Sequence, residues 1–255
     1  MTITLPADHR AVVVGTGAIG AAVCRAYARA GAIVLALDID EGIAIDVATS
    51  LPGGGHRGER LDVTDLSGAR AAAARAAPDG VSSLCFTAGV APTFDVLDFD
   101  WDSYRRTMAI NVDGALHIAH AFGVAMVRAG GGSMSFVSSV AGKHGAAGAA
   151  AYCASKFALR GVVESFAAEV GCHSVRVNAI CPGEVDTPML ARVAQARASR
   201  RGTDADAELE ELAAAAALGR LVDPGEVADV AVWLASDAAS AITGASIDVT
   251  AGLRV

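Results

Sequence analysis

Apolar runs of strand length alternate with longer helix-forming segments along most of the chain. The apolar and β-branched runs predict strands at residues 11–14, 32–37, 60–63, 81–86, 133–137 and 174–180. The segments between them predict helices at residues 21–30, 40–50, 66–77, 101–128 and 151–171. Residues 51–58 are glycine-rich and predict a loop, and residues 190–218 predict two short helices broken at Gly202-Thr203.

This order of elements predicts the fold class. Strands that alternate with helices build a parallel sheet, and the helices between them cover both of its faces through right-handed crossovers. We find no internal repeat, linker or low-complexity tail. The sequence therefore predicts one α/β domain over residues 1–255, built on a doubly wound parallel sheet.

A glycine-rich loop follows the first predicted strand. Its sequence is Gly15-Thr16-Gly17-Ala18-Ile19-Gly20, and a helix-forming segment comes directly after it. Strand, glycine turn and helix in this order are the context that a dinucleotide-binding fingerprint requires. The glycines allow backbone N–H groups to approach a pyrophosphate at the helix N-terminus. The loop therefore predicts a bound dinucleotide.

An acidic residue indicates which dinucleotide is bound. Asp38 ends the second predicted strand, 18 residues after Gly20. A carboxylate at this position can accept hydrogen bonds from both ribose hydroxyls of NAD, and it would repel the additional phosphate of NADP. The glycine loop carries no basic residue. We therefore expect NAD as the cofactor, with Asp38 and the adjacent Ile39 among its contacts.

Tyr152 and Lys156 lie four residues apart in the predicted helix 151–171, which places them on one helix face. A free tyrosine has a pKa of about 10 and exchanges protons poorly at neutral pH. A nearby ammonium favours the phenolate and lowers that pKa. Ser139 follows the strand 133–137, at the sheet edge where ligands bind in such folds. Together they predict a proton-transfer site for a hydroxyl or carbonyl. The competing interpretation is an exposed tyrosine beside a solvated lysine.

Composition narrows the function classes. The chain has 255 residues, 53% hydrophobic residues and a net charge of −8, which argues against nucleic acid or an anionic membrane as its main partner. No uncharged stretch is long enough to span a bilayer, and the N-terminus lacks the pattern of a signal peptide, so we expect a cytoplasmic protein.

Cysteine and histidine usage points to neither disulfides nor a metal. The five cysteines are an odd count without paired spacing, which predicts buried, reduced thiols. Cys153 adjoins Tyr152, but helical geometry turns it away, and we expect it to be a packing residue. His117 and His120 could share a helix face, but no third ligand is in view, so no metal site is expected.

The motif Tyr152-Cys153-Ala154-Ser155-Lys156, with Ser139 placed 13 residues before the tyrosine, resembles the signature of the short-chain dehydrogenase/reductase family. Residues 182–189 resemble the family's Pro-Gly-x-Val-x-Thr-Pro segment. The resemblance runs from Val12 to Gly252. It implies a Rossmann-type sheet of about seven strands, a last helix and seventh strand in the C-terminal segment, a mobile substrate lid at about residues 188–218, and a homotetramer.

The resemblance also implies roles for individual residues. Tyr152 would be the general acid/base, and Lys156 would lower its pKa and hold the nicotinamide ribose. Ser139 would orient the substrate oxygen. Asn111 would be the fourth catalytic residue, holding a water beside Lys156 through its side chain or the neighbouring backbone. The alternative for Asn111 is a polar residue that satisfies a helix kink near Gly114.

Further cofactor contacts are implied in the same way. Asp62 and Val63 would lie against the adenine, although this segment could also cap a helix through Thr64 or Asp65, and both can be true. The remaining implied contacts are Gly15, Gly17, Ala18, Ile19 and Gly20 in the loop, Ala88 and Gly89 under the dinucleotide, and Pro182, Gly183, Val185 and Thr187 at the nicotinamide.

Three segments differ from the family pattern. The glycine loop is one residue shorter than the usual Thr-Gly-x-x-x-Gly-x-Gly, so we expect a tighter phosphate loop. Phe86-Thr87-Ala88-Gly89 stands where the family has Asn-Asn-Ala-Gly, which predicts altered support for the central strands. The chain has Val-Thr-Ala-Gly near its end where Val-Asp-Gly-Gly is usual.

The resulting hypothesis is an NAD(H)-dependent oxidoreductase that transfers a hydride between nicotinamide and a secondary alcohol or ketone. One alternative is a non-catalytic NAD-binding regulator, suggested by the three differences. A second is a lyase such as a dehalogenase, against which Lys156 and the glycine loop argue.

The sequence does not identify the substrate. The expected pocket wall, residues 90–94 and 140–146, is mostly small or apolar, with Lys143 and His144 as its polar additions, and suits a neutral alcohol or ketone of moderate size. An acidic substrate at the arginines of the lid is the other possibility, but we expect these residues to form a solvated face; they are Arg192, Arg197, Arg200 and Arg201.

Overall fold

The computed structural model describes residues 3–253, and these residues form a seven-stranded parallel sheet. The strand order is β3-β2-β1-β4-β5-β6-β7. The strands are β1 (Arg10–Val14), β2 (Ile33–Asp38), β3 (Arg57–Arg60), β4 (Ser83–Phe86), β5 (Gly132–Val137), β6 (Val175–Pro182) and β7 (Ser246–Val249). The predicted doubly wound parallel sheet of about seven strands is confirmed, and the two residues at each end of the predicted domain lie outside the described part.

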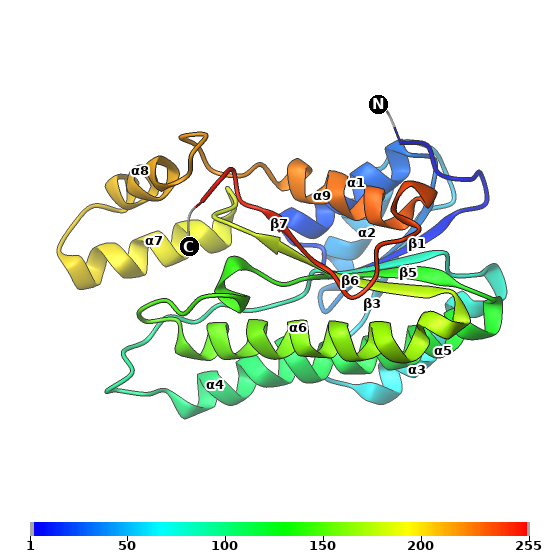
Figure 1. The fold of residues 1–255 in the computed structure, drawn as a ribbon, viewed down its shortest axis with the longest axis horizontal. Helices are drawn as coiled ribbons and strands as arrows, with labels where there is room; N and C mark the ends of the chain where they lie inside the picture. The colour runs from blue at the N-terminus through cyan, green and yellow to red at the C-terminus, as the bar shows by residue number, and fades with distance from the viewer. Residues whose placement is uncertain (1–2, 254–255) are drawn as a thin grey trace.

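Helices cover both faces of the sheet, as Figure 1 shows. The helices are α1 (Ala18–Arg29), α2 (Glu41–Thr49), α3 (Leu66–Ala76), α4 (Trp101–Met108), α5 (Gly114–Ala129), α6 (Ala150–Val170), α7 (Pro188–Arg201), α8 (Ala205–Ala215) and α9 (Pro224–Ala235). Helices α1, α2 and α9 lie on one face, and α3, α4, α5 and α6 lie on the other. Helices α7 and α8 extend beyond the sheet, where the substrate lid was predicted, and break at Gly202.

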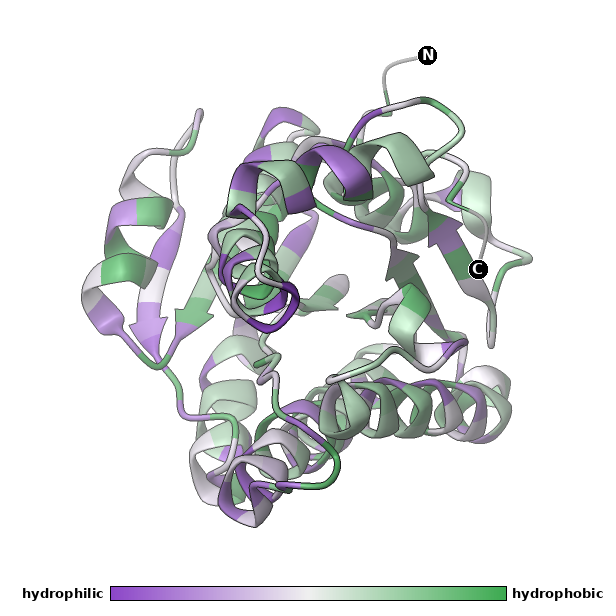
Figure 2. Cartoon of the chain, turned by 90° about the vertical axis from the view of Figure 1, so that its left-hand side faces the viewer, coloured by the Kyte–Doolittle hydropathy of each residue, from purple (hydrophilic) through white to green (hydrophobic). Residues whose placement is uncertain are grey.

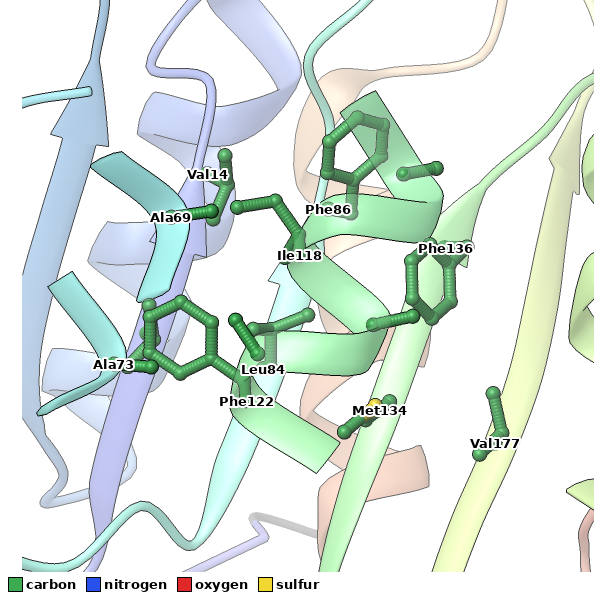
Figure 3. Close-up of a cluster of buried hydrophobic side chains, with 14 of the residues drawn as sticks. Val14, Ala69, Ala73, Leu84, Phe86, Ile118, Phe122, Met134, Phe136 and Val177 are labelled. Atoms are coloured by element: carbon green, nitrogen blue, oxygen red, sulfur yellow. The ribbon is translucent and has the colours of Figure 1, made fainter. Parts of the chain in front are cut away.

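The apolar runs of the sequence become the inner faces of these layers. Phe86 and Phe136 of the central strands are fully buried, with ring centroids 5.8 Å apart, and they pack toward Ile118 and Phe122 of α5 (Figure 3). On the other face, Tyr27 of α1 is fully buried. Hydrophilic residues concentrate on the outer sides of the helices (Figure 2). Burial of this apolar surface is the main stabilising contribution to the fold.

The third strand lies three residues earlier than predicted. We expected it at residues 60–63, where the apolar residues are, but β3 comprises Arg57–Arg60. Its register pairs Leu35 with Arg57 and Asp38 with Arg60. Gly58 lies against the backbone of Ala44 in α2, where a Cβ would overlap it. A strand at the edge of the sheet needs few apolar residues, so pairing with β2 and packing under α2 decide its position.

The long helical stretch is interrupted where a kink was anticipated. Residues Ala109–Asp113 form a π-helical segment between α4 and α5, and Asn111 lies within it. In the described part of the chain, the continuous stretch Trp101–Ala129 is the one helix that could cross a membrane by length and composition. More than half of its most apolar window (56%) is buried inside the protein, as is usual for a helix that packs against a sheet. π-helical turns often occur at functional sites.

Four of the five cysteines are buried free thiols, as expected. Cys153 is among them, and its packing role agrees with its burial. Cys172 differs, because it is exposed after α6, in the short turn that leads into β6. The prediction of buried thiols was wrong for this one residue, since a helix end at the surface leaves its side chain uncovered.

Candidate active site

A cavity of about 630 Å³ lies at the carboxyl ends of the central strands. Residues directly after β4, β5 and β6 line it, and α7 closes one side with Met189, Leu190 and Val193. In a doubly wound sheet the crevice for ligands forms where the strand order reverses, here between β1 and β4. The cavity therefore occupies the position that this topology assigns to a ligand.

Ser139, Tyr152 and Lys156 all line this cavity. Ser139 follows β5, and its Oγ accepts a hydrogen bond from the Ala141 backbone N–H at 3.1 Å. Tyr152 and Lys156 lie in the first two turns of α6, with the lysine Nζ 5.6 Å from the centre of the tyrosine ring. Helix α6 begins after the turn at Gly148, whose φ of +76° suits glycine. The three residues that the sequence grouped are thus in one cavity, and the exposed-tyrosine interpretation is wrong.

Burial dominates the proton affinities of the tyrosine and the lysine. It raises the pKa of Tyr152 to about 12, while hydrogen bonding by Ser139 opposes the rise. It also lowers the pKa of Lys156 to about 8, and the Lys156 Nζ donates a hydrogen bond to the Val137 carbonyl at 2.8 Å. The predicted lowering of the Tyr152 pKa by Lys156 is not seen, because desolvation is the largest effect on the tyrosine and Lys156 is not among the groups that shift its pKa.

Asn111 is held by a closed set of hydrogen bonds. Its Nδ2 donates to the Val90 carbonyl and to Ser155 Oγ, both at 2.9 Å, and its Oδ1 accepts from the Val90 N–H at 2.9 Å. Ser155 Oγ in turn donates to the Tyr152 carbonyl at 2.7 Å. Both amide protons of Asn111 are therefore used, so its side chain is not free to donate to a water. It connects the π-helical segment to the tyrosine helix, and the predicted water can be held by the neighbouring backbone or by the second lone pair of Oδ1.

The glycine loop is as tight as its short sequence predicts. Gly15 has a φ of +90°, and a Cβ there would lie 2.6 Å from the Ala88 backbone nitrogen. A Cβ on Gly20 would overlap the Gly15 carbonyl oxygen. Gly17 is the N-cap of α1 and has open space where its Cβ would be. The loop thus packs closely on the sheet side and leaves the helix N-terminus accessible, which suits a pyrophosphate.

Asp38 is bound to the loop rather than free. Its Oδ2 accepts from the backbone N–H and the hydroxyl of Thr16 at 2.6 and 2.8 Å, and its Oδ1 accepts from the Asp40 N–H at 3.1 Å. A carboxylate offers about four acceptor positions, so about one remains. Hydrogen bonds to both ribose hydroxyls would need two acceptor positions, which is more than remains. The carboxylate itself still lies at the carboxyl end of β2. Ile39 beside it is 61% exposed and available for a flat contact.

The expected adenine contacts lie in a capped turn. Asp62 Oδ1 accepts from the N–H and hydroxyl of Thr64, which lowers the pKa of Asp62. The cap of α3 is Asp65, which accepts from the Ser67 N–H at 2.9 Å. Val63 is buried against Gly114 of α5, where a Cβ would come within 2.7 Å. The capping interpretation is confirmed for Asp65, and a contact of Asp62 with adenine is compatible with it.

The segment after β6 is held from several sides. The Gly183 N–H donates to the Val249 carbonyl at 2.9 Å, and Val185 forms a bridge with Val222. Thr187 caps α7, accepting from the Leu190 N–H while its hydroxyl donates to the Val185 carbonyl, both at 3.2 Å. In this arrangement the Thr187 hydroxyl can accept a further bond from an amide. Pro182, Gly183, Val185 and Thr187 all line the cavity, as do Ile19 and Gly89.

Sequence reasoning missed three polar residues that support the site. Thr87 Oγ1 donates to the Gly15 carbonyl at 2.6 Å and so ties β4 to the glycine loop. Ser138 Oγ donates to the Lys156 carbonyl at 3.1 Å, and Ser155 connects Asn111 to Tyr152. Ser155 is the serine of the Tyr-x-Ala-Ser-Lys motif, so the sequence could have indicated its supporting role. Thr87 was visible only as a difference from the family pattern.

Two expectations about the pocket wall are corrected. Lys143 was expected to add polarity to it, but its Nζ pairs with Asp248 and leaves the cavity wall to His144. The arginines of α7 were expected to form a solvated face, and Arg200 and Arg201 are exposed, but together with the half-buried Arg197 they also line the cavity, because α7 lies across its mouth. Arg192 is exposed, as expected.

No group of histidine, cysteine and carboxylate side chains suited to a metal occurs among residues 3–253. His117 Nδ1 lies 2.9 Å from the Val63 carbonyl, which gives this ring a structural partner.

Comparison with known proteins identifies close relatives over nearly the whole chain. A family model described as enoyl-(acyl carrier protein) reductase matches residues 14–254. Galactitol 2-dehydrogenase (L-tagatose-forming) of Cereibacter sphaeroides is 38% identical over 250 residues, which cover 96% of this chain and 94% of the relative. D-threitol dehydrogenase of Mycolicibacterium smegmatis is 39% identical over 244 residues, which cover 93% and 89%.

A solved structure supports the same relationship. The crystal structure of a variant actinorhodin polyketide ketoreductase with NADPH superposes with a TM-score of 0.93 at 26% identity, covering 98% of this chain and 99% of the other.

Proposed function

The chain belongs to the short-chain dehydrogenase/reductase family of oxidoreductases, and from this premise we propose that it transfers a hydride between NAD(H) and a secondary alcohol or ketone. The observation that carries the proposal is one cavity lined by Ser139, Tyr152, Lys156 and Gly89. Two relatives are named as dehydrogenases of alcohols, galactitol and D-threitol, which supports an alcohol substrate.

The residues at the sheet edge fit a dinucleotide. Gly15 and Gly20 have no room for a Cβ, while Gly17 leaves the N-terminus of α1 open for a pyrophosphate. Gly89 lies near both the lysine and the asparagine, since a Cβ there would be 3.6 Å from Lys156 Nζ and 3.3 Å from Asn111 Oδ1. When bound over this surface, the nicotinamide supplies or accepts the hydride. Four further residues are proposed to contact the cofactor: Ala18 at the start of α1, Ala88 beside Gly15, and Ile19 and Thr187 in the cavity wall.

The proton is handled by the chain itself. Tyr152 is half-buried, and its raised pKa keeps it protonated at neutral pH, so in ketone reduction its hydroxyl donates the proton to the substrate oxygen. Ser139 hydrogen-bonds the same oxygen and keeps it in line with the tyrosine. In alcohol oxidation, Tyr152 must first lose its proton, and a charged Lys156 favours this loss. Asn111 and Ser155 fix the helix that carries both residues.

NAD rather than NADP is proposed because of Asp38. Its carboxylate is fixed by Thr16 at the end of β2, and no basic residue stands in the glycine loop to pair with a ribose phosphate. The actinorhodin ketoreductase structure contains NADPH, so the family itself does not decide the question. Repulsion between the Asp38 carboxylate and the additional ribose phosphate disfavours NADP, and NAD is unaffected because it lacks this phosphate.

Fluorescence titration of the purified protein with NADH and NADPH, followed by a panel of secondary alcohols monitored at the NADH absorbance band, tests the proposal. We expect tighter binding of NADH and turnover of at least one alcohol. Binding without turnover of any alcohol or of the matching ketones would favour the non-catalytic regulator instead. Equal catalytic efficiency with both cofactors would contradict the role of Asp38.

We also propose a cytoplasmic homotetramer. Helices α5 and α6 expose apolar side chains on the outer surface of the molecule, namely Leu116, Val124 and Phe157. Leu218, near the C-terminal segment, is 64% exposed. Contact with further copies of the chain would remove this apolar surface from water.

A further inference from the structure

Glu184 is a carboxylate inside the cavity that the proposed mechanism does not use. It directly follows β6, and its main chain is fixed on both sides. The Gly183 N–H donates to the Val249 carbonyl, and the Glu184 carbonyl accepts from the Val222 N–H, both at 2.9 Å. The main chain that carries this side chain is therefore held in place by the neighbouring segments.

Among residues 3–253, no side chain forms a hydrogen bond or a close ion pair with this carboxylate, and Arg197 acts on it only through its charge. That arginine lies 3.5 Å from Glu208, which is almost fully buried and also pairs with Arg201 at 3.0 Å. Burial raises the pKa of Glu184, which is the effect of lost water without a replacement partner. No buried side-chain oxygen among residues 3–253 lacks a hydrogen-bond partner, so this carboxylate is open to the cavity, where a ligand can supply the donors.

The carboxylate lies in the same cavity as the proposed proton donor. Glu184 and Tyr152 both line it, and Ser139 lines it too, after the neighbouring strand β5. The charge of Glu184 contributes to the raised pKa of Tyr152, in the same direction as burial. A substrate whose oxygen meets Tyr152 therefore shares this cavity with the Glu184 carboxylate.

The charges around the cavity indicate the chemical nature of that group. Arg197, Arg200 and Arg201 line the same cavity, but Glu208 pairs with Arg197 and Arg201, and Glu211 also pairs with Arg201. Arg200, which has no ion pair among residues 3–253, would repel an ammonium, whereas Glu184 would repel a carboxylate or phosphate held near it. Hydroxyl groups satisfy both kinds of side chain, because they donate to a carboxylate and accept from a guanidinium. The cavity therefore suits a neutral molecule with several hydroxyls better than a charged one or a simple alcohol.

We propose that Glu184 determines substrate specificity by accepting a hydrogen bond from a second substrate hydroxyl, so that diols and longer polyols are preferred over mono-alcohols. This inference rests on the proposed function, since it concerns the substrate of the same site. Glu184 contacts the hydroxyl adjacent to the reacting carbon, and the arginines of α7 reach the hydroxyls beyond it.

Paired substrates that differ by one hydroxyl test the inference. Steady-state kinetics with 2,3-butanediol and 2-butanol would be compared for the native protein, Glu184→Gln, Glu184→Ala and the control Asp186→Asn. Asp186 lies two residues away, is exposed and is not among the residues that line the cavity. Its variant therefore removes the same charge from the same segment outside the site.

We expect the native protein to prefer the diol. Glu184→Ala should lower kcat/KM for the diol about 10- to 100-fold, mainly through KM, as for loss of one hydrogen bond to a charged group. The mono-alcohol should change by less than about twofold, because it makes no such bond. Glu184→Gln keeps a neutral acceptor and should fall between, while Asp186→Asn should match the native protein.

Equal losses for both substrates in Glu184→Ala, or an unchanged diol preference, would overturn the inference and leave the proposed function standing. A loss of NADH binding in the same variant would also overturn it, because Glu184 would then belong to the cofactor site. If the native protein oxidises neither these substrates nor any alcohol of the panel, the proposed function itself fails.

Discussion

At the scale of single residues, Tyr152 and Lys156 show how burial sets the chemistry. Each is shielded from water, which favours the neutral form of both. The neutral tyrosine is the form that donates a proton to a ketone, and a lysine pKa of about 8 leaves Lys156 mostly charged at neutral pH, which is the form that favours the phenolate. The hydrogen bond from Lys156 to the Val137 carbonyl keeps the amine at the strand end and beside the cavity.

Replacing Tyr152 with phenylalanine should lower turnover by at least about a hundredfold, because the positioned proton donor is lost. The ring fits the same space, so NADH binding should remain within about twofold of native. Stopped-time assays with an alcohol from the panel, together with NADH titration, measure the two effects. Near-normal turnover would remove Tyr152 from the mechanism.

The pH dependence should have opposite signs in the two directions. Alcohol oxidation needs the phenolate, and the raised pKa of Tyr152 makes it scarce at neutral pH, so oxidation should speed up with rising pH. Ketone reduction needs the protonated tyrosine, which dominates at neutral pH, so reduction should stay nearly constant there and slow down only as the pH approaches the tyrosine pKa of about 12. In Lys156→Met the ammonium is absent, so the oxidation profile should move to higher pH. An unchanged profile in that variant would show that Lys156 does not assist the proton loss.

At the scale of elements, the short glycine loop and the strand end β4 form one unit. Thr87 Oγ1 reaches the Gly15 carbonyl, and Gly15 and Gly20 pack without room for a side chain. Two of the differences from the family pattern thus meet: the loop is shorter, and a threonine replaces an asparagine at the position that supports it. The threonine hydroxyl replaces one lost support with a direct bond to the loop.

Thr87→Ala should therefore weaken NADH binding by about two- to tenfold, which corresponds to the loss of one neutral hydrogen bond. Thr87→Ser keeps the hydroxyl and serves as the matched control, with binding close to native. Fluorescence titration of the three proteins gives the dissociation constants. If the alanine and serine variants bind NADH equally, the hydroxyl has no part in holding the loop.

At the scale of the whole molecule, the sheet order brings distant segments to one edge. Strand ends at β4, β5 and β6 meet at the cavity, and α7 returns across its mouth with three arginines. Helices α5 and α6 expose apolar residues on their outer surface, which suits contact with other copies.

Light scattering coupled to size exclusion should give the mass of four chains of 25.6 kDa each. Replacing Phe157 on α6, which is 46% exposed, with glutamate should shift the mass toward smaller assemblies, because a charge would be buried in the contact. Replacing Val96, which is 65% exposed in the loop between β4 and α4, with glutamate provides the control. A native mass of one chain would contradict the homotetramer.

The order of elements, the fold class and the grouping of Ser139, Tyr152 and Lys156 could be predicted from the sequence. The strand, glycine loop and helix around Gly15 to Gly20, and the pair Tyr152 and Lys156 on one helix face, are local patterns with local physical causes. Their detection needs no knowledge of distant contacts.

Other features of the fold and the site depend on contacts between segments that are distant in the sequence. The position of β3 follows from pairing with β2, and Asn111 is locked by Val90 and Ser155, which are 21 and 44 residues away. The raised pKa of Tyr152, the binding of Asp38 by Thr16 and the unpaired state of Glu184 all depend on which groups surround them. Burial and hydrogen bonding between distant segments are properties of packing, and packing is set by the whole fold rather than by any short pattern.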